Sequence, residues 1–141
     1  MEIQVPLEIV ELEDNSYHII TTVLIGSIEG DFIIDTGASV TVIDRNTPFS
    51  HEAIADVPEI NSGGVSGRIE EVKLVNLPTF QIGDYTIENL HAAVIDLDYV
   101  NTLYEKQLRR RISGLLGSDF LVKFKAVIDY ENKYLRLKVS D

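Results

Sequence analysis

Short apolar runs rich in β-branched residues, separated by turn-forming residues, dominate the chain. The first clear run spans residues 17–25 (YHIITTVLI), and the glycine-containing stretch 26–31 (GSIEGD) that follows it predicts a turn. Two shorter apolar runs come next, at residues 32–34 and 40–43. Runs of this length between turn signals are typical of strands, so the first third of the chain predicts β-structure.

The second half of the chain continues this pattern. Residues 77–82 and 85–96 predict two more strands, joined by a turn at Gly83 and Asp84. Residues 123–129 and 134–139 predict a terminal hairpin, in which apolar and basic residues alternate as in a half-buried strand.

Helical spacing of apolar residues is convincing in one segment, residues 99–112, and Gly114 follows it as a stop signal. Many short strands with one helix favour a mostly-β barrel or sandwich. The length of 141 residues, without a visible linker or internal repeat, predicts a single domain over residues 1–141.

Composition narrows the functional classes. The net charge of -11 argues against partners with anionic surfaces, so we expect neither nucleic-acid nor membrane-surface binding. The absence of cysteine excludes disulfides and thiolate metal sites. The first ten residues do not resemble a signal peptide, and no apolar run approaches the roughly 20 residues that cross a bilayer. We therefore expect a soluble protein, in a compartment that the sequence leaves open.

The candidate chemistry lies in the tripeptide Asp35-Thr36-Gly37, directly after an apolar run. A carboxylate that leaves a buried strand in a tight turn is held rigidly, with hydroxyl and amide donors nearby, which suits general acid–base work. The tripeptide alone favours an ordinary turn over a catalytic loop, because Asp and Gly are common turn residues. Its sequence context decides between these interpretations.

Three spaced features together resemble the retropepsin-like aspartic proteases. Residues 23–40 match the family's strand, turn, strand and catalytic loop, ending in Asp35-Thr36-Gly37-Ala38-Ser39. The glycine-rich residues 61–67 (NSGGVSG) stand where the family has its flap hairpin, and residues 114–121 (GLLGSDFL) match its hydrophobic-hydrophobic-Gly element. The resemblance implies a closed β-barrel of the acid-protease type.

The resemblance also implies a mechanism and a partner. Family members need two Asp-Thr-Gly loops, and this chain has one, so the second would come from an identical chain in a homodimer. The pair of Asp35 carboxylates would share a proton and activate a water for hydrolysis of peptide bonds in an extended polypeptide. Thr36 would brace the opposite loop and Gly37 would accept a hydrogen bond from the substrate backbone. The mechanism uses no metal and no cofactor.

Substrate-binding residues are implied on both sides of the cleft. On the loop these are Ala38 and Ser39, and on the flap tip they are Gly63, Gly64, Val65 and Ser66. Ala38 offers no hydroxyl donor to the ionised carboxylate pair, so we expect activity at weakly acidic rather than strongly acidic pH.

Two features depart from the retroviral pattern. Ser118 stands where those enzymes usually have arginine, and the strong helix at 99–112 precedes the third element instead of following it. The dimerisation mode of the retroviral enzymes therefore does not carry over directly. Asp119 lacks a following Thr-Gly, so we expect it to have a structural role.

One alternative function stays open: a catalytically silent dimerisation or peptide-binding module with the same fold. Other candidate sites are weaker. The three histidines (His18, His51 and His91) lack metal-ligand spacing. The basic run 109–111 is interpreted as the solvated face of the predicted helix.

Overall fold

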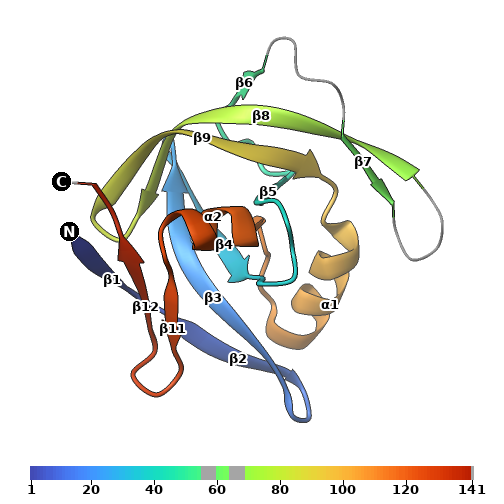
Figure 1. Cartoon of the computed structure of the whole chain (residues 1–141). Helices are drawn as coiled ribbons and strands as arrows, with labels where there is room; N and C mark the ends of the chain where they lie inside the picture. The colour runs from blue at the N-terminus through green and yellow to red at the C-terminus, as the bar shows by residue number, and fades with distance from the viewer. Residues whose placement is uncertain (55–59, 64–68, 141) are drawn as a thin grey trace.

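The computed structural model describes residues 1–54, 60–63 and 69–140, with side chains described outside residues 60–63 and 69–72. Figure 1 labels the helices and strands and colours the chain from blue at the N-terminus to red at the C-terminus. In chain order they are β1 (Glu2–Pro6), β2 (Glu8–Glu13), β3 (Ser16–Ile25), β4 (Ile28–Ile34), β5 (Val42–Asp44), β6 (Glu52–Ala53), β7 (Ile60–Gly63), β8 (Ile69–Ile82), β9 (Tyr85–Ile95), α1 (Asp98–Leu108), β10 (Gly114–Leu116), α2 (Ser118–Lys123), β11 (Val127–Asp129) and β12 (Tyr134–Lys138).

Within the described part of the chain, six strands close into a barrel. Around the barrel each strand pairs with the next in the order β3, β4, β10, β5, β9 and β8, and β8 pairs back to β3. The strand β10 is central to the closure, because it pairs in parallel with β4 and antiparallel with β5. The mostly-β, closed-barrel expectation is therefore confirmed.

A separate three-stranded sheet joins the two ends of the chain. Its order is β1-β12-β11, with both pairings antiparallel. The N–H of Val139 donates to the carbonyl of Met1 at 2.9 Å, so the two termini lie side by side (Figure 1). The predicted terminal hairpin is present, but its first strand covers only Val127–Asp129, because residue 123 belongs to α2.

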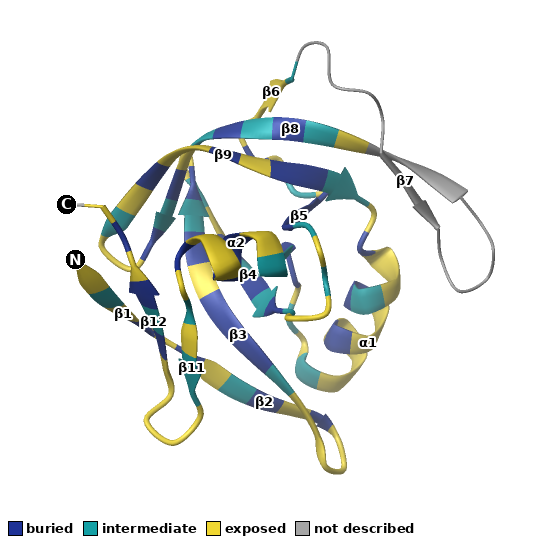
Figure 2. Cartoon of the chain, in the orientation of Figure 1, coloured by how far each residue is buried: buried dark blue, intermediate teal, exposed yellow. Residues whose placement is uncertain are grey.

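Aromatic side chains from the barrel strands and from α2 pack together in the main buried cluster. Figure 2 marks the buried positions along the strands in dark blue. Phe80 is fully buried, and its ring centroid lies 6.0 Å from that of Phe32 and 5.8 Å from that of Phe120. A second buried cluster, which includes Tyr104 and Ile112, packs α1 against the outside of the barrel. Burial of such side chains is the main stabilising contribution to the fold.

The predicted turn at residues 26–31 is wrong for most of its length. Gly26 has a φ of 62° and makes the turn, but β4 already begins at Ile28. Gly30 lies inside the strand, where an added Cβ would stand 2.8 Å from the ring of Phe49 and 2.9 Å from Cβ of Ser113. This glycine marks a close approach of neighbouring side chains, which a sequence pattern cannot distinguish from a turn.

The expectation of a single helix over residues 99–112 is also wrong. The helix α1 spans Asp98–Leu108 and ends at Arg109, whose φ of 54° is left-handed. A second helix, α2, follows β10 directly, so the third element (residues 114–121) itself runs from a strand into a helix. Six residues are too few to show a helical repeat in the sequence, which explains why α2 was missed. No helix in the described residues is long and apolar enough to span a bilayer.

The basic run 109–111 does not lie on a solvated helix face. After the end of α1 the chain runs beside the barrel, where the N–H of Ser113 donates to the carbonyl of Asp31 at 2.8 Å. The guanidinium of Arg110 contacts the carboxylates of Glu8 (2.6 Å) and Asp31 (2.9 Å). These contacts tie the segment after α1 to the strands of the barrel.

Candidate active site

Asp35 lies at the end of β4, where the chain leaves the barrel and enters the loop of residues 35–41. Its N–H donates to the carbonyl of Leu116 at 2.9 Å, which extends the parallel pairing of β4 and β10 by one hydrogen bond. The residue is half-buried, in contrast to the exposed Thr36 and Gly37 that follow. The carboxylate is thus held at the edge of a rigid strand pair with part of its surface accessible.

The loop folds back on the Asp35 carboxylate. The N–H of Gly37 donates to Oδ1 of Asp35 at 3.0 Å, and the N–H of Ala38 donates to the Asp35 carbonyl at 3.1 Å. No other described side chain hydrogen-bonds to the hydroxyl of Thr36, which is exposed. Ser39 is also exposed. The loop therefore fixes one carboxylate oxygen by a backbone donor and presents its own polar groups outward.

The turn between β10 and α2 packs against the loop of residues 35–41. The N–H of Ser118 donates to the carbonyl of Ala38 at 2.7 Å. A Cβ added at Gly117 would lie 2.7 Å from the backbone of Val40, so only glycine permits this approach. The predicted packing of the hydrophobic-hydrophobic-Gly element beneath the loop is present in the structure.

The side chains of Thr41 and Asp119 connect the same two segments. The N–H of Gly117 donates to Oγ1 of Thr41 at 3.1 Å, and that hydroxyl donates to Oδ1 of Asp119 at 2.8 Å. The second oxygen of Asp119 accepts the N–H of Thr41 at 3.1 Å. Asp119 therefore holds the end of the loop against the start of α2.

The structure describes only some of the predicted flap residues. Gly63 ends β7 and pairs with Ile69 at the start of β8, so a hairpin occupies the expected place in the chain. Figure 1 shows this hairpin projecting beyond the barrel. Gly64, Val65 and Ser66 lie outside the described residues.

The comparisons with known proteins agree with this architecture. The family model described as aspartyl protease matches residues 21–120, more than half of the chain. The chain belongs to the aspartyl protease family. Its fold is similar to the crystal structure of a retropepsin-like aspartic protease from Rickettsia conorii, with a TM-score of 0.54 and 20% sequence identity over 97% of this chain and 90% of that one. A sequence search of curated proteins finds no match.

Sequence reasoning missed one structural acid of this aspartyl protease, Asp44 at the end of β5. Its side chain is fully buried and pairs with the guanidinium of Arg111 at 2.8 Å. It also accepts the N–H of Leu97 at 3.2 Å and the hydroxyl of Thr47 at 3.3 Å. Asp44 thereby anchors the strand that leaves the loop to the start of α1. The sequence feature that could have pointed to Asp44 is its position directly after the apolar run 40–43.

The described histidines of the protease have structural partners or lie at the surface. Nδ1 of His18 is hydrogen-bonded to the hydroxyl of Tyr104 at 2.5 Å, and Nδ1 of His51 to the carbonyl of Phe49 at 2.9 Å. His91 is exposed. Within the described residues, no three His, Asp or Glu side chains are grouped so as to hold a metal ion.

Proposed function

We propose that this aspartyl protease is an endopeptidase that acts as a homodimer, with Asp35 of each chain forming the catalytic pair. The observation that carries the proposal is the loop geometry at Asp35. The carboxylate is half-buried at the end of a paired strand and receives the N–H of Gly37. Family membership supplies the reaction class.

A second chain is needed because the sequence contains a single Asp-Thr-Gly. Two loops from identical chains meet around a two-fold axis, where the same patch faces itself. The exposed hydroxyl of Thr36, without a partner among the described residues, is then available to the opposite loop. This arrangement agrees with the role that the family resemblance gives to Thr36.

Catalysis follows from the proximity of the two Asp35 side chains. Two adjacent carboxylates cannot both ionise easily, so they share one proton and titrate as a pair. The ionised member takes a proton from a water, which attacks the scissile carbonyl, while the protonated member hydrogen-bonds to the carbonyl oxygen. Gly37, Ala38 and Ser39 line the loop side of an extended peptide, and the hairpin tip with Gly63 to Ser66 closes over it.

The decisive experiment compares wild type with Asp35→Asn on a diverse peptide library, with cleavage read by mass spectrometry from about pH 4 to 7.5. We expect the substitution to lower turnover by about 1000-fold or more, because both carboxylates of the homodimer become amides, which can neither share a proton nor take one from a water. Asp14→Asn, at an exposed turn position, is the matched control and should retain full turnover. A separate turnover profile of wild type, extended down to about pH 2, should peak at weakly acidic pH; a maximum below about pH 3, near the pepsin pair, would contradict the expectation from Ala38.

The silent-module alternative makes the opposite prediction. Wild type would then be dimeric by sedimentation yet cleave no peptide, and Asp35→Asn would change nothing. Cleavage that survives Asp35→Asn would contradict both the proposed catalytic pair and the silent module.

A further inference from the structure

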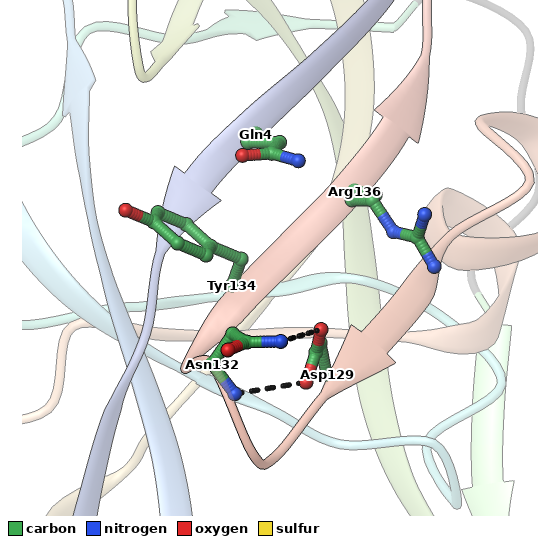
Figure 3. Close-up of a pocket in the computed structure, with 5 residues that line it drawn as sticks. All are labelled: Gln4, Asp129, Asn132, Tyr134 and Arg136. Atoms are coloured by element: carbon green, nitrogen blue, oxygen red, sulfur yellow. Dashed lines mark hydrogen bonds between the residues drawn. The ribbon is translucent and has the colours of Figure 1, made fainter.

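The outer face of the terminal sheet carries a polar pocket. Along β12, Leu135 and Leu137 are buried in the core, so Arg136 between them faces outward. Arg136 stands opposite Gln4 of β1 and Val127 of β11. The pocket has a volume of about 420 Å³, within the usual size of small-molecule sites. Its lining is drawn in Figure 3: Gln4, Asp129, Asn132, Tyr134 and Arg136.

Arg136 differs from Arg110 and Arg111, two of the arginines that follow α1. Arg110 and Arg111 each pair with carboxylates. Arg136 forms no ion pair with any described residue, although the chain has a net charge of -11. Its Nε atom is buried and has no hydrogen-bond partner in the described part of the chain. A buried guanidinium N–H without an acceptor is costly. Because Nε has almost no accessible surface, a bound anion would contact the guanidinium through its two terminal nitrogens.

The rest of the lining offers both donors and acceptors. No described group hydrogen-bonds to the side-chain amide of Gln4 or to the hydroxyl of Tyr134 within the pocket. The carboxylate of Asp129 accepts the backbone N–H and the side-chain amide of Asn132, both at 2.9 Å (Figure 3). These two hydrogen bonds lower the pKa of Asp129, so it stays ionised at neutral pH. An anionic acceptor and an unpaired cation therefore line the same pocket.

We propose that this pocket binds the α-carboxylate of an amino acid or of a short peptide's C-terminus, with the adjacent N–H directed to Asp129. The planar guanidinium fork of Arg136 matches a carboxylate through two parallel hydrogen bonds. The side-chain amide of Gln4, which Figure 3 shows between Tyr134 and Arg136, adds a neutral donor. A ligand that carries a negative group next to an N–H satisfies both charges of the pocket, whereas an inorganic anion leaves Asp129 facing a like charge.

The site is distinct from the candidate active site. All five lining residues belong to the terminal sheet or its β11–β12 turn, and the loop of residues 35–41 contributes none. Binding at this pocket is therefore measurable without any peptidase activity, and the proposal stands or fails independently of the proposed function.

The test uses ¹⁵N-labelled full-length protein in NMR titrations at neutral pH and low salt. The probes are N-acetylalanine, free alanine, N-acetylalanine amide and inorganic phosphate. N-acetylalanine should shift the Nε–H signal of Arg136 and the side-chain amides of Gln4 and Asn132. Its amide, which lacks the carboxylate, should shift none of them. A larger shift with N-acetylalanine than with free alanine assigns the site to peptide C-termini, and the reverse assigns it to amino acids.

Three variants test the role of the guanidinium. Arg136→Met should weaken N-acetylalanine binding about tenfold or more, and Arg136→Lys should restore it only in part, because lysine keeps the charge and loses the fork. Lys138→Met is the matched control, since Lys138 is the next outward residue of β12 and lies outside the pocket. It should bind like wild type.

Other results would overturn the proposal. These are the absence of carboxylate-dependent shifts in wild type, equal binding by the amide, tighter binding of phosphate, or unchanged binding by a folded Arg136→Met protein. Dispersed amide spectra of each variant establish that it is folded before binding is compared.

Discussion

Replacing Gly117 by alanine tests whether the turn after β10 sets the position of the catalytic loop. The added Cβ would lie 2.7 Å from the carbonyl carbon and oxygen of Val40 and 2.9 Å from the carbonyl oxygen of Ala38. All three contacts are with backbone, so no side-chain rotation relieves them. Gly117 has φ -90° and ψ 178°, which alanine adopts freely, so the substitution adds no backbone strain to the steric contact.

The expected loss in free energy of unfolding is about 1–3 kcal/mol, the usual range for overpacking a tightly packed site. The matched control is Gly37→Ala in the same loop, where an added Cβ would meet only Oδ1 of Asp35 at the ordinary distance of 3.4 Å. Alanine restricts the unfolded chain, so the control should be as stable as wild type or up to about 1 kcal/mol more stable.

Urea unfolding followed by far-UV circular dichroism gives both values. Protein concentrations must be equal, because dimerisation would add to the apparent stability. Peptide turnover of Gly117→Ala should also fall, since relief of the contact moves the loop that carries Asp35. The reasoning is refuted if the two alanine variants unfold within about 0.5 kcal/mol of each other.

Two further predictions concern buried polar groups around α1. Arg111→Ala should lower the free energy of unfolding in urea by about 1–3 kcal/mol, because it leaves the fully buried carboxylate of Asp44 without its cation. The loss should stay below the usual range for a buried ion pair, because the side chain of Arg111 is itself half-exposed. Arg109→Ala is its control, since Arg109 has no ion pair among the described residues, and an equal loss in both variants would contradict the prediction. Burial raises the pKa of Tyr104 from 10.0 to about 12, so between these values only the unfolded tyrosine ionises. Wild type should therefore lose roughly 3 kcal/mol of stability as pH rises through the interval. Tyr104→Phe, which also removes the hydrogen bond to His18, should make this alkaline limb of the stability profile shallower, and an unchanged slope would count against the assignment.

Much of the fold and the Asp35-Thr36-Gly37 loop of the candidate site could be predicted from the sequence, because the patterns that indicate them are local. An apolar run followed by Asp35-Thr36-Gly37 places an acid at a strand end, and β4 does end at Ile34. The apolar residues before Gly117 predicted a buried element beneath the loop, and β10 is that element. Alternation and turn signals act over a few residues, so they survive in the sequence alone.

The positions that were misjudged depend on partners distant in the chain. Gly30 has the composition of a turn, but its neighbours Phe49 and Ser113 make it a strand residue. Arg110 and Arg111 continue a helical pattern by propensity, yet α1 ends before them and their carboxylates come from β2, β4 and β5. Tertiary contacts override local propensity where a charged side chain needs a partner or where closely packed neighbours leave no room for a side chain.

The sequence by itself indicated most of the strands after residue 16, the single Asp-Thr-Gly loop and the glycine that lets another segment approach it. Only the tertiary structure decided how the barrel closes, that Asp119 and Thr41 lock the loop, and that Arg136 lines a pocket in which no described carboxylate forms a direct ion pair with it. The physical reason is that the positions of strands and turns along the chain depend on residues that are neighbours in the sequence. Closure, hydrogen-bond networks and unpaired charges depend on residues that become neighbours only when the chain has folded.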